Sequence, residues 1–175
     1  CVSGRPRNHR RALVKRAQDI VIGAGLLALF ALPMLAISIA IKADSRGPVL
    51  YRQRRHGFNN RVITVLKFRT MRHDPGAPMR QVRANDPRVT RLGGFLRRTS
   101  LDELPQLFNV LMGQMSLVGP RPHAIGMRAA DRDLSHIVAE YAHRHRVKPG
   151  ITGWAQVNGS RGPVETPAGV RARVA

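Results

Sequence analysis

Two of the chain's ten acidic residues, Asp102 and Glu103, stand side by side in a strongly basic sequence. Arg97 and Arg98 precede them by about one helical turn. A carboxylate beside guanidinium groups can react with a phosphate: it attacks the phosphorus or holds a metal ion, while the guanidinium groups neutralise the phosphate oxygens. This acidic pair is therefore the first candidate for chemistry on a phosphorylated substrate.

The same residues could instead begin a helix. Ser100 and Glu103 have the spacing of a capping box, and Asp102 as the cap would place Pro105 in the first turn, where its missing N–H is harmless. The helix that follows is expected to stop near Gly113 and to carry on one face the apolar side chains of Leu104, Leu107, Phe108 and Leu111. The two roles are compatible, because a helix N-terminus also offers free backbone N–H groups to a phosphate.

The charge of the chain predicts an anionic partner. Its 175 residues carry 30 Lys and Arg against 10 Asp and Glu, a net charge of +20, and 26 of the basic residues are Arg. Phosphates, a lipid surface or nucleic acid would each match this charge. The length fits one domain with a modest core, or one domain plus a membrane element. The single cysteine, Cys1, excludes an intrachain disulfide.

An uncharged stretch of 22 residues, 20–41, is long enough to span a bilayer as one helix. It exceeds the apolar part of a secretory signal, and a domain of this size has no interior that could bury a run apolar on every side. Pro33 lies inside the run, and basic residues flank both ends. A helix–break–helix that enters and leaves the same leaflet keeps both flanks in the cytoplasm, whereas a kinked spanning helix places one outside; the flanks favour the first.

The remainder of the chain predicts short strands, loops and helices. Residues 49–53 and 62–68 are expected to be strands, joined by a turn at residues 57–60. Residues 73–86 lack apolar periodicity and predict a loop. Residues 127–146 have the apolar spacing of an amphipathic helix.

Two further stretches contain candidates for ligand binding. In residues 116–122, prolines on both sides of Arg121 restrict its backbone, which suits bidentate binding of a phosphate; a turn with a solvated arginine is the alternative. Residues 149–159 hold the only tryptophan, Trp154, which could stack on a base or sugar, lie at a membrane interface or pack in the core. The sequence contains no Gly-rich nucleotide loop and no zinc-site spacing.

Taken together, these segments resemble the bacterial sugar transferases, the monotopic phosphoglycosyl transferases that act on polyprenyl phosphate. The resemblance covers residues 15–162, and its motifs occur in one order. They are Lys15-Arg16 before the apolar segment broken by Pro33, and residues 47–49, 67–71, 86–90, 100–106, 116–122 and 149–159. The stretch 119–124 is most similar to the members that transfer glucose 1-phosphate to undecaprenyl phosphate.

The resemblance implies an α/β fold in which a small irregular catalytic domain is anchored by an N-terminal re-entrant membrane helix. Residues 1–15 would form a basic N-terminal segment, residues 16–42 the re-entrant helix, and residues 43–175 a cytosolic catalytic domain truncated at its C-terminus. The chain would lie on the cytoplasmic face of the bacterial inner membrane, in contact with membrane lipid, and could form a homo-oligomer.

The resemblance also implies a reaction. Asp102 would attack the β-phosphate of a UDP-sugar, release UMP and hold the sugar phosphate covalently until undecaprenyl phosphate collects it, as the first membrane step of polysaccharide synthesis. Glu103 would support the site, and Mg²⁺ would bind at Asp102 and Glu103. The residues expected to bind substrate are the basic ones of the matching motifs: Lys67, Arg69, Arg88, Arg97 and Arg121.

The sequence also leaves two alternatives to this enzyme. The charge suits a nucleic-acid-binding protein, although the apolar run and a supply of only eight aromatic residues argue against one. An inactive membrane-bound fragment is the other, because related chains usually continue beyond the end of this one at Ala175. Leu32 and Gln114 also depart from the family, which commonly has Ser and Asp there. The expected partners are a UDP-sugar, undecaprenyl phosphate and membrane lipid, with no nucleic acid.

Overall fold

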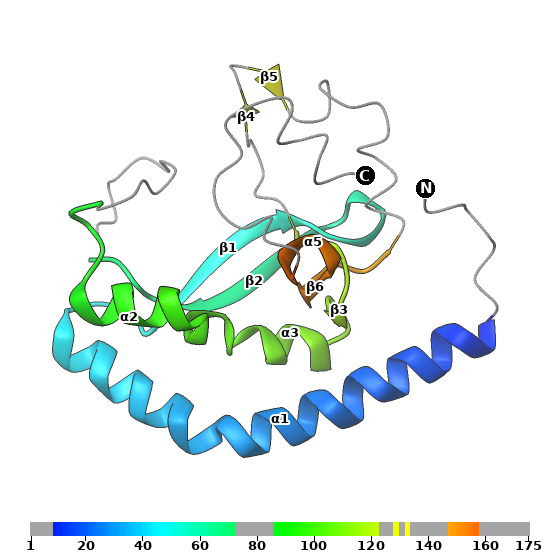
Figure 1. The fold of residues 1–175 in the computed structure, drawn as a ribbon, viewed down its shortest axis with the longest axis horizontal. Coiled ribbons are helices and arrows are strands. Elements are labelled where there is room, and N and C mark those ends of the chain that lie inside the picture. Colours follow the sequence, from blue (N-terminus) through cyan, green and yellow to red (C-terminus); the bar gives the residue numbers. More distant parts are fainter. Residues whose placement is uncertain (1–8, 73–85, 123–127, 130–131, 134–146, 158–175) are drawn as a thin grey trace.

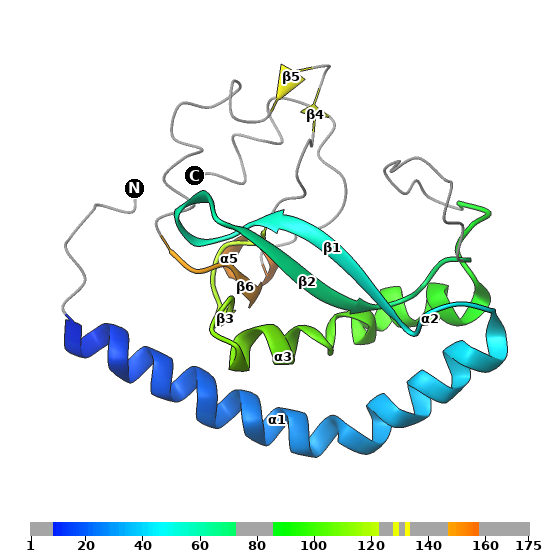
Figure 2. The ribbon, with the colours of Figure 1, turned by 180° about the vertical axis from the view of Figure 1, so that it is seen from behind.

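A computed structural model of the chain describes residues 9–72, 86–122, 128–129, 132–133 and 147–157. One long helix, α1 (His9–Asp44), lies along the underside of a small domain (Figure 1). Two short helices, α2 (Arg91–Thr99) and α3 (Gln106–Leu111), lie between α1 and the hairpin of β1 (Leu50–His56) and β2 (Val62–Phe68), as the view from behind also shows (Figure 2). The predicted α/β domain with an apolar N-terminal helix is confirmed.

The long helix α1 runs without interruption and is longer than the predicted segment 16–42. Pro33 lies inside it, where the ring removes one backbone hydrogen bond, and the helix curves along its length (Figure 1). The Ser38 hydroxyl donates to the Met34 carbonyl one turn back, a contact that also favours bending. The expected helix–break–helix is therefore a single bent helix.

Much of the apolar surface of α1 faces away from the domain. Leu32 is 78% exposed and Val21 is 71% exposed, and the same surface includes Leu29, Leu35 and Ile39. Within the described residues, α1 is the one helix that is long and apolar enough to cross a membrane. Because an apolar surface of this size is unfavourable in water, it is typical of a face that lipid or another protein covers.

The beginning of α1 is bonded to the domain through a buried carboxylate, Asp19. It accepts hydrogen bonds from the Lys15 ammonium at 2.5 Å and from the Ser116 hydroxyl at 2.8 Å. It also accepts one from the backbone N–H of Leu117 at 3.1 Å. These donors satisfy the buried charge and attach α1 to strand β3 (Ser116–Val118).

Two arginines, one near each end of α1, donate hydrogen bonds to carbonyls at helix ends. Arg16 donates to the carbonyls of Val110 and Leu111, at the end of α3. Arg69 donates to the carbonyls of Ser45 and Arg46, just beyond the end of α1. Because the last carbonyls of a helix lack partners within the helix, these contacts both cap the helices and hold both ends of α1 against one domain.

The register of the hairpin decides which side chains share a face. Arg55 pairs with Ile63, and Gln53 pairs with Val65. Directly opposed residues point to the same side of an antiparallel pair, and residues two apart on a strand do so as well. Arg55, Val65 and Lys67 therefore lie on one face of the hairpin. The two predicted strands are confirmed, although the first is longer than expected.

Within the described residues, the core contains two apolar clusters. The first lies between the second half of α1, α2 and the end of β2, and its buried members are Met34, Ile41, Phe68 and Leu96. The second joins β2, α3 and the start of β3 through Val65, Val110 and Met115. Because β2 contributes to both clusters, its Lys67 is held by packing on either side.

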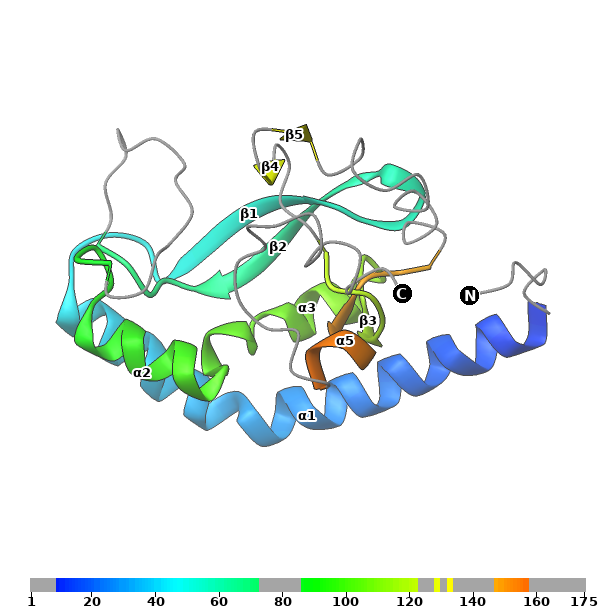
Figure 3. The ribbon, with the colours of Figure 1, turned by 45° about the horizontal axis from the view of Figure 1, so that its top comes forward.

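The remaining elements are short. A 3-10 turn (Phe58–Asn60) closes the hairpin, and β3 pairs in parallel with β6 (Gly150–Thr152) beside α5 (Trp154–Val157), which is seen next to β3 in Figure 3. Strands β4 (Arg128–Ala129) and β5 (Arg132–Asp133) pair antiparallel.

Two expectations for the second half of the chain need correction. The predicted helix 127–146 is wrong where the structure describes it, because β4 and β5 use backbone groups there for strand pairing. The rest of that segment, and residues 73–85 of the predicted loop, lie outside the described residues. Core packing is also wrong for Trp154, which is 83% exposed.

Candidate active site

The acidic pair lies in a 3-10 turn, η2 (Leu101–Glu103), between α2 and α3. Leu101 and Leu104 are three residues apart, so they share one side of such a turn, and both pack against the first core cluster. The two carboxylates lie between these leucines in sequence and turn toward Lys67 of β2. The two leucines anchor the turn in the core, and the two acidic residues between them are thereby held toward Lys67.

Neither predicted capping role is present. Ser100 ends α2 in a left-handed conformation, with a φ of 59°, and its side chain makes no capping hydrogen bond to η2. Helix α3 begins after Pro105, also without a side-chain cap. The capping prediction is wrong because α2, η2 and α3 follow one another directly: the N–H groups of Glu103 and Leu104 bond to carbonyls of the preceding turn. The side chain of Asp102 is therefore not engaged as a cap.

The end of α3 and its apolar face were also predicted. The helix stops at Leu111, and Gly113 follows with a φ of 77°, which confirms the predicted stop. The predicted face is only partly right. Leu107 is buried, but Phe108 is 40% exposed, because the face that packs against β2 carries Asn109 and Val110 instead.

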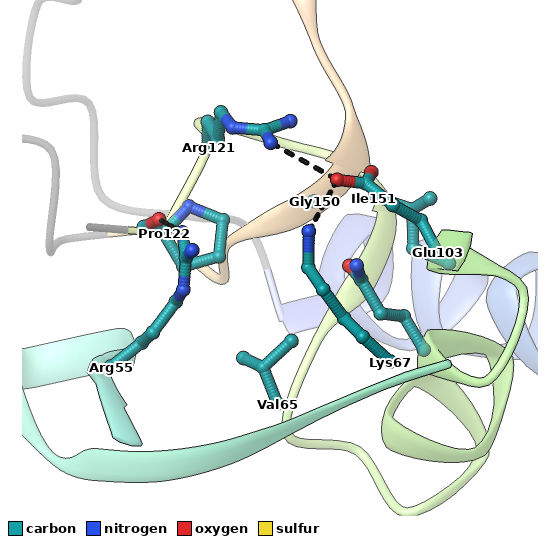
Figure 4. Close-up of a pocket in the computed structure, with 9 residues that line it drawn as sticks. Arg55, Val65, Lys67, Glu103, Arg121, Pro122, Gly150 and Ile151 are labelled. Carbon is teal, nitrogen blue, oxygen red and sulfur yellow. Dashed lines mark hydrogen bonds and ion pairs between the residues drawn. The ribbon is translucent and has the colours of Figure 1, made fainter. Parts of the chain in front are cut away.

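A single lysine links the two carboxylates. The Lys67 ammonium lies 2.7 Å from Oε1 of Glu103 and 4.0 Å from Oδ2 of Asp102. Arg121 donates to the same Glu103 oxygen at 3.0 Å (Figure 4). Glu103 therefore forms ion pairs with two cations. Asp102 accepts no hydrogen bond from another residue in the part of the chain that the structure describes.

The pKa values of the two neighbours move in opposite directions. Burial raises the pKa of Asp102, and Lys67 only partly opposes this effect. Burial also acts to raise the pKa of Glu103, but the attraction of Lys67 and Arg121 outweighs it and lowers the pKa below its ordinary value. Glu103 is therefore the stable counter-ion, and the ionised form of Asp102 is the poorly stabilised one. A carboxylate of this kind is typical of a reactive group.

A pocket opens beside Glu103, and Asp102 is not among the residues that line it (Figure 4). It is lined by Arg55, Val65, Lys67, Glu103, Gln106, Arg121, Pro122, Gly150 and Ile151. Three of these side chains are cations and one is an anion, so the pocket suits a negatively charged ligand such as a phosphate. A Cβ atom at Gly150 would lie 2.1 Å from the backbone nitrogen of Gly119, so this wall of the pocket requires glycine.

Three of the five basic residues predicted to bind substrate lie near the acidic pair. Lys67 and Arg121 line the pocket. Arg97 is close enough to Asp102 to lower its pKa, and its Nε donates to the Thr70 hydroxyl at 2.8 Å. These three cations surround the carboxylates from β2, from the loop after β3 and from α2.

The other two predicted residues lie elsewhere. Arg69 is buried, and its guanidinium is occupied by the Ser45 and Arg46 carbonyls after α1. Arg88 forms an ion pair with Asp86 at 2.6 Å, a contact that lowers the pKa of Asp86 to about 2. Neither side chain is among those that line the pocket. Arg69 and Arg88 therefore stabilise local structure and do not line this pocket.

The acidic pair offers part of a Mg²⁺ site. Mg²⁺ prefers oxygen ligands and usually takes one or two carboxylates together with water and substrate phosphates. Asp102 fits this role, because no other described residue donates a hydrogen bond to it, whereas Oε1 of Glu103 already contacts two cations. No group of three or more His, Cys, Asp and Glu side chains forms a metal site within the described residues. Phosphate and water would have to complete the coordination.

Arg55 and Asn109 lie outside the motifs that the sequence offers. Arg55 reaches the pocket because of its place in the hairpin register, which became visible only when the first strand proved to extend beyond the predicted residues 49–53. Asn109 is fully buried. Its Oδ1 accepts from the Leu66 backbone N–H at 3.0 Å, and its Nδ2 donates to the Thr64 carbonyl at 2.7 Å. It thus joins α3 to the strand that carries Lys67.

We expect Asn109→Leu to reduce the free energy of unfolding by roughly 1–3 kcal/mol, because it removes the hydrogen-bond partner of the part-buried Leu66 N–H and Thr64 carbonyl. Leucine has a similar size, so lost hydrogen bonds and not a cavity would cause the change. Urea denaturation of the detergent-solubilised protein measures it. A variant as stable as the parent would show that the Asn109 contacts are dispensable.

The chain matches a family of known proteins. Residues 10–174 match the family described as bacterial sugar transferase. The chain is 54% identical over 164 residues to an undecaprenyl-phosphate glucose phosphotransferase of Komagataeibacter xylinus, covering 93% of this chain and 31% of that protein. It is 51% identical over 165 residues to the exopolysaccharide production protein PSS of Rhizobium leguminosarum bv. phaseoli, covering 93% and 82%.

A third relative is the UDP-glucose:undecaprenyl-phosphate glucose-1-phosphate transferase of Escherichia coli (strain K12). It is 50% identical over 155 residues, which cover 88% of this chain and 33% of that protein. The chain therefore spans about a third of the Komagataeibacter and Escherichia proteins and most of the Rhizobium protein.

Proposed function

The chain belongs to the bacterial sugar transferase family, and we propose that it transfers glucose 1-phosphate from UDP-glucose to undecaprenyl phosphate in exopolysaccharide synthesis. Family membership confirms the resemblance predicted from the motifs. The names of the Komagataeibacter and Escherichia relatives support glucose as the sugar and undecaprenyl phosphate as the acceptor. The name of the Rhizobium relative supports a role in exopolysaccharide production. The same matches favour a transferase over a nucleic-acid-binding protein.

One observation carries the assignment of the reacting group. Asp102 is a buried carboxylate that serves no other residue as a hydrogen-bond acceptor within the described residues, and the Lys67 ammonium lies 4.0 Å from it. Burial raises its pKa, so its charge is poorly stabilised until a substrate arrives. The adjacent pocket supplies cations for phosphate oxygens. This arrangement supports Asp102 as the group that attacks a phosphate.

In the proposed reaction, a carboxylate oxygen of Asp102 forms a bond to the β-phosphorus of UDP-glucose. The bond between that phosphorus and the bridging oxygen breaks, and UMP leaves with the electron pair. A phosphate oxygen of undecaprenyl phosphate then attacks the same phosphorus and breaks its bond to Asp102. The carboxylate is regenerated, and no net proton transfer is needed. Lys67 and Arg121 would stabilise the charge on the phosphate oxygens during both steps.

Glu103 has a positioning role in this proposal. It holds Lys67 and Arg121 at the pocket through one carboxylate oxygen. We propose that Mg²⁺ binds at Asp102 with the second oxygen of Glu103 nearby, where the ion would supply further neutralisation of phosphate charge. Gln106 and the glycine wall at Gly150 limit the space beside these groups.

Radiolabelled UDP-glucose tests the proposed function directly. Detergent-solubilised protein is incubated with it and undecaprenyl phosphate, and we expect label in the lipid extract together with release of UMP. Without the lipid, intact-protein mass spectrometry should detect the added mass of one hexosyl phosphate. If neither lipid labelling nor UMP release occurs with UDP-glucose or other UDP-sugars, the proposed function is wrong.

We also propose that the chain lies on the cytoplasmic face of the inner membrane. The exposed apolar surface of α1 supports membrane contact. Contacts of Arg16 and Asp19 near one end of α1, and of Arg69 at the other, join both ends to one domain. A helix with both ends on one water-soluble domain returns to the side that it entered, which favours the re-entrant topology over a full span.

A topology experiment uses Cys1, the single cysteine of the chain, which lies outside the described residues. We expect a membrane-impermeant thiol reagent to leave Cys1 unlabelled in intact cells and to label it after permeabilisation, because both ends of α1 are on the cytoplasmic side. Permeabilised cells are the control for reactivity of the thiol. Labelling in intact cells would mean that α1 spans the membrane.

A further inference from the structure

Arg55 is a cation of the pocket that lacks an acidic partner. Its Nε and Nη2 donate to Oε1 of Gln53 at 3.1 Å and 2.7 Å, and its Nη1 donates to the Pro122 carbonyl. Both acceptors are neutral. Within the described residues, no carboxylate lies at ion-pair distance from this guanidinium, whereas Lys67 and Arg121 both contact Glu103.

The charge of Arg55 is costly where it lies. Burial, followed by repulsion from Arg121, lowers its pKa to about 10. Arg55 is half-buried at the wall of the pocket, and a cation there without an acidic partner points to a ligand that supplies the missing charge. A guanidinium has five N–H donors, and the bonds described here use three of them. The two that remain are one each on the two terminal nitrogens.

We propose that Arg55 binds a second phosphate group, next to the one that Asp102 attacks. The proposal deepens the proposed function and takes the identity of the phosphates from it. Lys67 lies beside Asp102, while Arg55 is opposite Ile63, four residues along β2. That separation is about 13 Å between the two positions along the hairpin, so the two side chains enter the pocket from different points of the sheet.

The positions of the side chains support two adjoining phosphates. Figure 4 shows Arg55 and Lys67 on either side of Val65, with Arg121 on the loop above them. A phosphate attacked by Asp102 would meet Lys67 and Arg121. A second phosphate, displaced toward Pro122, would lie between Arg121 and Arg55 and relieve their mutual repulsion. The second group could be the phosphate of the departing nucleotide or that of the lipid acceptor, which have the same chemistry.

Pyrophosphate is the probe for this inference, because it carries two linked phosphates and its binding needs no transfer activity. We expect Arg55→Gln to weaken pyrophosphate binding at least about tenfold by isothermal titration calorimetry at constant ionic strength. The matched control is Arg54→Gln, which removes the same charge from an exposed position on the opposite face of β1. Its affinity should stay within about twofold of the parent, the change expected for a screened surface charge.

Equal pyrophosphate affinity in Arg55→Gln and Arg54→Gln would overturn the inference. If Arg55→Gln does not fold, Arg55→Lys decides by the same comparison, because it keeps the charge but loses the planar fork. A purely structural Arg55 would lower the melting temperature without changing the increase in melting temperature that pyrophosphate causes. We expect that increase to be smaller in Arg55→Gln than in the control.

The KM values of Arg55→Gln for the two substrates show which molecule carries the second phosphate. A higher KM for UDP-glucose alone would identify the nucleotide phosphate, and a higher KM for undecaprenyl phosphate alone would identify the acceptor; either result supports the inference. Because calorimetry needs no turnover, Arg55-dependent pyrophosphate binding in a chain that transfers no sugar would refute the proposed function and leave this inference standing.

Discussion

Asp102→Asn is expected to reduce transfer by about 10⁴-fold or more, the scale observed when a catalytic residue is removed. An amide oxygen is too weak a nucleophile to form an acyl phosphate. The fold should survive, because Asp102 caps no helix and accepts no hydrogen bond from another described residue. Burial raises its pKa, so removing the charge should leave stability at neutral pH unchanged or higher. Lipid labelling and thermal unfolding measure the two effects.

The matched control is Asp44→Asn, which removes a carboxylate from an exposed position at the end of α1. It should transfer sugar phosphate at the rate of the parent. The hexosyl phosphate adduct should be absent from Asp102→Asn and present in the control. Transfer by Asp102→Asn at the parental rate would exclude Asp102 as the nucleophile.

Lys67→Met is expected to have the second largest effect, a loss of about 10²–10³-fold in kcat/KM. One charged donor to a transition-state oxyanion typically contributes a factor of this size. Lys67 also holds Glu103 at 2.7 Å, so its loss disturbs the counter-ion of Arg121. Methionine retains most of the length and packing of the side chain. Lys42→Met, at an exposed position of α1, is the control and should have little effect.

The pH dependence of Lys67→Met distinguishes electrostatics from packing. Asp102 must be ionised to attack, so activity is lost as the pH falls through its pKa, which burial raises above the ordinary value of 3.8. Lys67 lowers that pKa, and its removal should move the acid limb of the kcat/KM profile to higher pH. A profile with the same acid limb as the parent would indicate that Lys67 does not act on the charge of Asp102.

Local pattern determined much of the architecture. The long uncharged run predicted the apolar helix, although Pro33 does not break it as expected, and the apolar, mostly β-branched residues at 62–68 predicted β2. The rarity of carboxylates in so basic a chain was enough to single out Asp102 and Glu103. Motifs in a constant order identified the family, which the comparison confirms.

The tertiary structure decided which basic residues serve the pocket. Arg69 and Arg121 both lie in family motifs, yet one satisfies carbonyls after α1 and the other contacts Glu103. With 26 arginines in the chain, residue type alone cannot separate these roles. The contacts depend on the path of the chain over long sequence separations, which local pattern does not specify.

The same limit explains the missed residues and the wrong caps. Arg55 lines the pocket because the hairpin register pairs it with Ile63. Asn109 joins α3 to β2 by hydrogen bonds because these two elements pack together. The sequence around Ser100 satisfies the rules of a capping box, but α2 runs directly into η2, where the N–H groups of Glu103 and Leu104 bond to the backbone carbonyls of Ser100 and Leu101 in place of a side-chain cap. Residue types and spacing thus determined the elements and the reacting pair. Packing between distant elements decided which side chains surround that pair.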